Sequence, residues 1–290
     1  MKKHLFHPAV LFCALAVVLS LTTAPFAKVE WEILKDITLT DDPRDIVIAS
    51  DGSTAYILCS KSVQIYSTRE KKVTGSIPLT DDFSQIAIAP NGEELFLTKT
   101  AGKQLSVIKV SQVYDIPIGT SPVIGKAGAP VTIYAFLDYQ WPYCSRIFPE
   151  LEQLLKKYPN DANLVIKHFP LRMHPFAEKA SIAALAAAEQ DKYEEFSSAL
   201  LKDFKNLSDQ TIKKHAEAVG LDMEKFNAAS SNPELKKQIQ EDLKLGSSVK
   251  VRGVPAIFIN GRMPKQRSLA GFSQMVEEEL KKWTTTALKR

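Results

Sequence analysis

An internal repeat constrains the first part of the chain more strongly than any other feature of the sequence. Residues 37–52 match residues 77–92 without a gap, at an offset of 40 residues. Each copy has an Asp-Gly or Asn-Gly pair between two apolar runs, and such pairs favour tight turns because they tolerate positive φ. A third short apolar run follows in each copy. The repeat therefore predicts two copies of one all-β unit.

The repeated unit resembles the YVTN-type β-propeller repeats of bacterial envelope proteins, because about 40 residues of short strands are typical of one blade. Residues 116–118 echo residues 77–79, as though a third copy began and stopped. Two copies are too few for a closed propeller, which usually has roughly four to eight blades. Residues 28–118 are therefore predicted to form a small open β module, or to complete a surface with another chain. Since the module contains no cluster of titratable residues, we interpret it as a spacer or docking platform.

The second part of the chain has the pattern of an α/β domain. A stretch rich in Gly, Ser and Pro over residues 119–129 precedes an apolar strand from Val131 to Leu137. Beyond this strand the apolar periodicity predicts a helix, a strand, a block of helices, a strand and a final helix. We place the boundary near Gly119, so that residues 119–290 form an α/β domain with a helical insertion.

The segment 129–149 carries the most extensive resemblance in the sequence. It is similar to the active-site segment of the DsbA-like thioredoxin-fold thiol–disulfide oxidoreductases. The segments 168–171, 174–177 and 251–261 are similar to further landmarks of that family, in the same order. The resemblance extends over about residues 121–283 and implies a thioredoxin fold with a helical insertion.

The resemblance fails at the position that matters most for chemistry. In that family a strand delivers a Cys-Pro-Tyr-Cys motif to the start of a helix, where the helix dipole stabilises the attacking thiolate. The corresponding residues here are Trp141, Pro142, Tyr143 and Cys144. Because Trp141 replaces the first cysteine, the motif cannot cycle a disulfide of its own. If the protein is an enzyme, the resemblance implies a thiol–disulfide oxidoreductase of the DsbA type.

Three interpretations of Cys144 remain open at this point. In the first interpretation it is a buried remnant, because a cysteine is small and apolar enough to pack in a core. Alternatively it is a catalytic monothiol that exchanges disulfides with partners or is oxidised to sulfenic acid. In the third interpretation it forms a bridge with Cys59, which the repeat places at a strand end with some exposure, although spacing alone cannot establish contact.

The loss of one cysteine leaves a polypeptide-binding site plausible. Val254-Pro255 resembles the cis-proline that faces the active-site helix in thioredoxin folds, and it would leave backbone groups free for an extended substrate. Trp141 is either a rigid apolar anchor for such a substrate or a plug that covers Cys144. The resemblance thus implies a substrate-binding site made of Trp141, Pro142, Tyr143, Val254 and Pro255.

Residues 1–27 have the layout of a secretory signal peptide. The basic start at Lys2 and Lys3 is followed by an apolar run, and small residues lie near a cleavage point after Ala27. This layout predicts a protein exported to the periplasm or otherwise out of the cytoplasm. An uncleaved anchor is the alternative, and only then would the chain be attached to a membrane.

Composition and spacing narrow the expected partners. The net charge is +4 and the lysines are scattered along the chain, so nucleic-acid binding is not expected. His168 and His174 lack neighbours at metal-ligand spacing, so we expect structural roles for them and neither a metal nor another cofactor. The leading hypothesis is an exported DsbA-like protein that binds extended or unfolded polypeptide. The alternatives are monothiol exchange at Cys144 and a non-catalytic periplasmic scaffold for partner proteins.

Overall fold

The structure, a computed structural model, describes residues 30–99 and 101–287. The predicted signal peptide, residues 1–27, lies outside the described residues. The chain divides into two compact units between Ile108 and Lys109. In the part of the chain that the structure describes, no helix is both long enough and apolar enough to cross a membrane.

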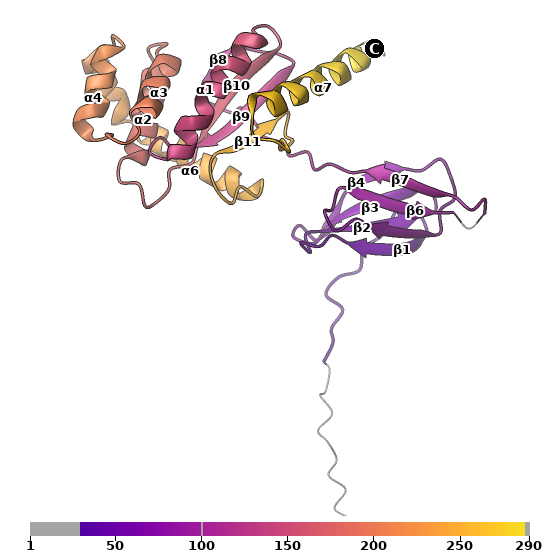
Figure 1. The fold of residues 1–290 in the computed structure, drawn as a ribbon. Helices are drawn as coiled ribbons and strands as arrows, with labels where there is room; N and C mark the ends of the chain where they lie inside the picture. The colour runs from indigo at the N-terminus through magenta and orange to yellow at the C-terminus, as the bar shows by residue number, and fades with distance from the viewer. Residues whose placement is uncertain (1–29, 100, 288–290) are drawn as a thin grey trace, which may run out of the picture. The chain divides into compact units, whose positions relative to one another are not determined.

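The first unit contains two β-sheets, one from each copy of the repeat (Figure 1). The strands in chain order are β1 (Pro43–Ile48), β2 (Thr54–Cys59), β3 (Ser62–Ser67), β4 (Lys72–Pro78), β5 (Gln85–Ile88), β6 (Glu94–Thr98) and β7 (Leu105–Lys109). The first sheet has the order β1-β2-β3-β4 and the second has the order β5-β6-β7. Both sheets are open, and the described residues form no closed propeller.

The two copies of the repeat make the same turn. Gly52 and Gly92 have φ values of 67° and 73°, in the left-handed region that glycine adopts at little cost. Each glycine N–H donates a 2.8 Å hydrogen bond to the carbonyl three residues earlier, at Ala49 and Ala89. The Asp-Gly and Asn-Gly pairs therefore mark strand-to-strand turns, as predicted.

The second unit is built on a mixed sheet with the strand order β11-β9-β10-β8. Its strands are β8 (Val123–Gly125), β9 (Val131–Leu137), β10 (Ala162–His168) and β11 (Ala256–Ile259). β9 pairs with β10 in parallel and with β11 antiparallel, and β8 is antiparallel to β10. β10 is buried along its whole length and β9 almost so, which explains their nearly continuous apolar runs.

Seven helices of the described chain belong to this unit. They are α1 (Pro142–Lys157), α2 (Ala177–Ala188), α3 (Tyr193–Lys202), α4 (Asp209–Ala218), α5 (Met223–Ser230), α6 (Pro233–Ser248) and α7 (Leu269–Ala287). α1 and α7 contact each other and the sheet, whereas α2 to α5 contact one another and form the insertion (Figure 1). Ser208 caps α4, because its side chain accepts the Thr211 N–H. From β9 onward the order of elements matches the one predicted from the sequence, whereas β8 was not predicted.

Residues 110–118, predicted to belong to the β module, pack in the second unit. The Tyr114 N–H donates to the carbonyl of Gly261 at 2.8 Å, and the Tyr114 ring meets Phe258 edge-on at 5.6 Å between centroids. Ile116 is buried in the core of this unit. The interrupted third copy of the repeat is thus used as a packing segment of the α/β unit.

Candidate functional site

The Trp-Pro-Tyr-Cys motif lies at the junction between β9 and α1. β9 ends at Leu137, and Trp141 caps the helix with an extended backbone, φ −86° and ψ 122°. Pro142 opens the helix, where its missing N–H leaves no hydrogen bond unmade. The Trp141 carbonyl accepts the N–H groups of Cys144 at 3.0 Å and Ser145 at 3.2 Å. The structure therefore places the motif at a helix start, as in the resemblance.

Cys144 lies in the core, with no exposure to solvent. Burial raises the pKa of its thiol to about 12, although the Asp138 N–H, which donates to Sγ at 3.4 Å, acts in the opposite direction. A helix start lowers the pKa of an exposed cysteine, but Cys144 is buried, and desolvation is the largest influence on its pKa. At neutral pH the thiol is protonated, which removes the nucleophile that monothiol exchange requires. These observations favour the buried-remnant interpretation.

Cys59 ends β2, but the predicted exposure is wrong, because its side chain is fully buried. β2 is an inner strand flanked by β1 and β3, and Gln64 Nε2 lies 3.6 Å from the Cys59 sulfur. Both Cys59 and Cys144 are free thiols in the structure. Each sulfur is buried within its own unit, so neither is accessible to form a bridge with the other.

Trp141 belongs to a small aromatic cluster that reaches the surface. Its ring lies 5.4 Å from that of Tyr143 and 5.5 Å from that of His174, measured between centroids. Trp141 is half-buried, whereas Tyr143 is 54% exposed and has the guanidinium of Arg146 5.0 Å from its ring centre. The cluster offers a binding partner aromatic faces beside a positive charge.

Asp138, which was not among the residues predicted from the sequence, fixes the loop that carries this cluster. Its fully buried carboxylate accepts the N–H of Gln140 at 2.7 Å and the N–H of Leu171 at 2.7 Å. His174 Nδ1 lies 2.8 Å from the same carboxylate. These bonds tie the turn before Trp141 to the loop that supplies His174. The available signal was a lone acidic residue directly after a buried strand.

Val254 and Pro255 lie at the same end of the sheet as the motif. Both residues are buried, and the peptide bond between them is cis. In the antiparallel pairing of β11 with β9, Ala256 is opposite Phe136. The residues before Ala256 therefore run alongside the chain that leaves β9 toward the motif. The register brings the Val254-Pro255 loop and the motif at Trp141, the two predicted parts of the binding site, to the same end of the sheet.

A buried polar cluster lies at the end of the neighbouring strand. The His168 N–H donates to Asp242 at 2.8 Å, and the Lys167 ammonium lies 3.4 Å from the same carboxylate. His168 Nε2 is 3.3 Å from the Tyr193 hydroxyl. Burial, assisted by the charge of Lys167, lowers the pKa of His168 to about 3, so the ring is neutral at physiological pH. Over residues 30–99 and 101–287, no three His, Cys, Asp or Glu side chains are grouped to hold a metal ion.

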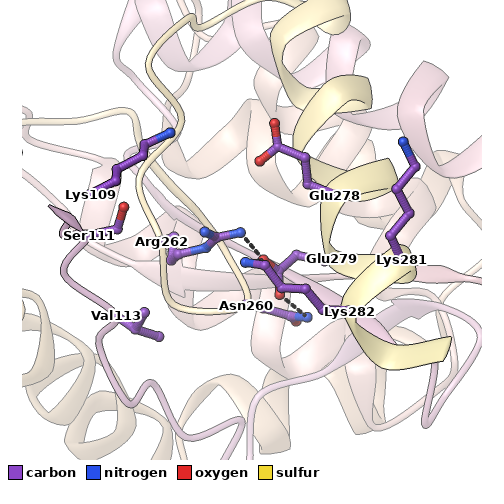
Figure 2. Close-up of a pocket in the computed structure, with 9 residues that line it drawn as sticks. All are labelled: Lys109, Ser111, Val113, Asn260, Arg262, Glu278, Glu279, Lys281 and Lys282. Atoms are coloured by element: carbon purple, nitrogen blue, oxygen red, sulfur yellow. Dashed lines mark hydrogen bonds and ion pairs between the residues drawn. The ribbon is translucent and has the colours of Figure 1, made fainter. Parts of the chain in front are cut away.

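A pocket of about 570 Å³ lies elsewhere in the second unit (Figure 2). Its lining residues are Lys109, Ser111, Val113, Asn260, Arg262, Glu278, Glu279, Lys281 and Lys282. Glu279 accepts hydrogen bonds from Asn260 at 3.3 Å and Lys282 at 2.9 Å, and it pairs with Arg262 (Figure 2). No residue of the predicted site lines this pocket.

Comparison with known families and curated proteins finds matches that cover part of this chain. The family model described as Thioredoxin matches residues 118–278. The Na(+)/H(+) antiporter NhaA 3 of Salinispora tropica is 32% identical over 155 residues, which are 52% of this chain and 24% of the antiporter. The NhaA 1 protein of Salinispora arenicola is 30% identical over 56% of this chain and 26% of its own length. The chain thus spans about a quarter of these curated relatives.

Solved structures that include a thioredoxin-like oxidoreductase are similar to more than half of the chain. A thioredoxin-like oxidoreductase from Silicibacter pomeroyi is 28% identical with a TM-score of 0.50, over 57% of this chain and 94% of that one. The catalytic domain of Proteus mirabilis ScsC is 25% identical with a TM-score of 0.50, over 58% and 92%. The thiol-disulfide exchange protein α-DsbA2 of Wolbachia pipientis, 23% identical with a TM-score of 0.51 over 55% and 87%, supports the fold alone.

Proposed function

This chain belongs to the thioredoxin family, and from that premise we propose that its α/β unit binds extended polypeptide without two-cysteine redox chemistry. One observation carries the proposal. The motif keeps its place at the start of α1, while Trp141 replaces the attacking thiol and Cys144 is buried. The structural neighbours are thiol–disulfide oxidoreductases, so a site that handles polypeptide thiols is the ancestral state that we infer.

The chemical part of the proposal follows from the two positions of the motif. Thiol–disulfide exchange begins with attack by a thiolate. Trp141 has no thiol, and the pKa of about 12 leaves Cys144 protonated at neutral pH. The site therefore lacks both the nucleophile and an accessible resolving thiol.

The binding part rests on the surface that remains. Trp141 and Tyr143 supply apolar area with few rotatable bonds, and the Asp138 carboxylate holds the loop before them in one conformation. The Val254-Pro255 loop at the same end of the sheet would supply backbone groups for an extended chain. An unfolded polypeptide with exposed apolar side chains fits such a surface better than a small molecule does.

Substitution of the aromatic residues tests the binding proposal. Trp141→Ala and Tyr143→Ala should each weaken binding of a reduced, carboxymethylated polypeptide by about tenfold or more, since a buried aromatic contact is commonly worth about 2 kcal/mol. Fluorescence anisotropy of the labelled polypeptide measures the affinity. Trp283→Ala is the matched control, because Trp283 is exposed on α7 and lies outside the site. Equal affinities for all four proteins would reject the proposed site.

We also propose that residues 1–27 direct export to the periplasm, on the basis of their basic start and apolar run. The β module would then act in that compartment as a propeller-like docking platform. Mass spectrometry of the protein from the periplasmic fraction should find a mature N-terminus close to residue 28. A full-length chain in the cytoplasmic fraction would refute export.

A further inference from the structure

The two copies of the repeat bury equivalent side chains to different extents. Ile86 on β5 is 7% exposed, whereas Ile46, its equivalent on β1, is 57% exposed. Ile88 is half-buried, and its equivalent Ile48 is exposed. β5 packs against β1 of the preceding sheet. In the described chain no sheet precedes β1 in the same way, so its apolar face is left uncovered.

The second sheet also lacks a strand that the first sheet has. The first sheet ends in β4, but the second stops at β7, whose Leu105 and Val107 are exposed. The residues that would form the fourth strand are bound elsewhere, since the Tyr114 N–H donates to Gly261 of the α/β unit. Within the described residues β7 is thus an edge strand with apolar side chains, an arrangement that favours pairing with another strand.

A candidate for the missing strand precedes β1. Residues 32–38 lie 40 positions before β4, at the same phase of the repeat. They lead into β1 as β4 leads into β5. The segment pairs with no sheet, and Trp31 is 83% exposed, with Ile33 and Leu34 exposed beside it. It therefore has the position and the apolar side chains of an outer strand, yet within residues 30–99 and 101–287 it joins no sheet.

The register of the first sheet predicts one opposite-charge pair between the segment and β7. β3 and β7 are the third strands of the two copies, and because two residues are inserted in the longer turn before β7, Val63 corresponds to Leu105 at an offset of 42. In the first sheet Ser67 is paired with Lys72 of β4. Transferred to the second sheet, this register places Glu32 opposite Lys109, an opposite-charge pair that stabilises neighbouring strands.

We propose that two copies of this chain associate head to tail through their β modules. Residues 30–39 of each copy add an outer strand to β7 of the other, and the face with Ile46 and Ile48 packs on the other copy's second sheet. Within one copy the segment pairs with neither sheet of the described chain, and β1, which follows it, packs against β5. Reciprocal exchange between two copies closes a ring of four sheets, the smallest number usual for a propeller.

Sedimentation of the full chain tests the association. The wild type should be a dimer at micromolar concentration, and Ile46→Lys should weaken the dimer at least about tenfold, because the interface would bury an unpaired charge. Ser76→Lys is the matched control, since it adds the same charge at an exposed position of β4. Circular dichroism of each variant verifies that the sheets are intact. A monomeric wild type, or a dimer unaffected by Ile46→Lys, would overturn the proposal.

Cysteine cross-linking tests which strands are exchanged. Gln64 is paired with Ser76 in the first sheet, which predicts that Asp36 of one copy lies opposite Ser106 of the other. Asp36→Cys and Ser106→Cys proteins, mixed and mildly oxidised, should form a covalent heterodimer, and the buried Cys59 and Cys144 should contribute little background. A bridge within a single chain of the double variant, without covalent dimers, would show that the strand adds within one copy and would reject exchange.

Discussion

Replacing Trp141 with cysteine is expected to convert an inactive scaffold into a thiol–disulfide oxidoreductase. The variant restores a two-cysteine motif at the helix start, where the pKa of an exposed thiol can fall to about 3.5–7.5. Since burial raises the pKa of Cys144 to about 12, the introduced thiol would be ionised at pH 7 at least about 10⁴ times more often. Oxidation of a dithiol peptide, with oxidised glutathione as the terminal oxidant, should rise at least about 100-fold over the wild type.

Two companion variants separate the steps of this reaction. Trp141→Ser removes the indole without adding a thiol and should remain inactive. Trp141→Cys combined with Cys144→Ser should form a mixed disulfide with glutathione but fail to turn over, because no second thiol resolves it. A folded Trp141→Cys protein with no activity would mean that the scaffold has lost the geometry for exchange, contrary to our account.

The second large effect expected is loss of stability in acid through His168. Its folded pKa is lowered to about 3, whereas the unfolded chain has an ordinary histidine pKa of about 6.5. Between these values the unfolded chain binds a proton that the folded chain does not, so the free energy of unfolding falls as the pH drops. At about 1.4 kcal/mol per pKa unit, His168 should account for about 4 kcal/mol between pH 7 and pH 3.

Comparison of the wild type with His168→Phe isolates the contribution of His168 to stability in acid. Burial raises the pKa of Asp242 to about 6. The contribution of this carboxyl to the free energy of unfolding therefore falls as the pH rises from about 4 to about 6, which is opposite in sign to the contribution of His168. His168→Phe keeps the backbone N–H that donates to Asp242 and should flatten the acid limb measured by urea unfolding. Parallel pH profiles for the wild type and His168→Phe would contradict the prediction.

The location of the site was predictable because the sequence signals are local. A continuous apolar strand, a proline at the first helical position and the motif itself lie within a few residues of one another, from Val131 to Cys144. The Val254-Pro255 loop was predictable only through the resemblance, since the pairing of Ala256 with Phe136 joins segments far apart in the chain.

The reactivity of Cys144 and the role of Asp138 could not be predicted from local sequence signals. Whether Cys144 is reactive depends on whether its side chain turns into the core or out of it, and a position at a helix start is compatible with both. The role of Asp138 depends on the loop at Leu171 and His174, which only the tertiary structure brings to its carboxylate. The exposure predicted for Cys59 was wrong because the sequence does not show which strands flank β2.

We propose that this protein binds polypeptide without thiol chemistry of its own. The most direct measurement compares the wild type and Cys144→Ser side by side for dithiol oxidation and for insulin reduction. Our account predicts that both proteins remain at the uncatalysed background and are indistinguishable. Turnover by the wild type that Cys144→Ser abolishes would contradict it.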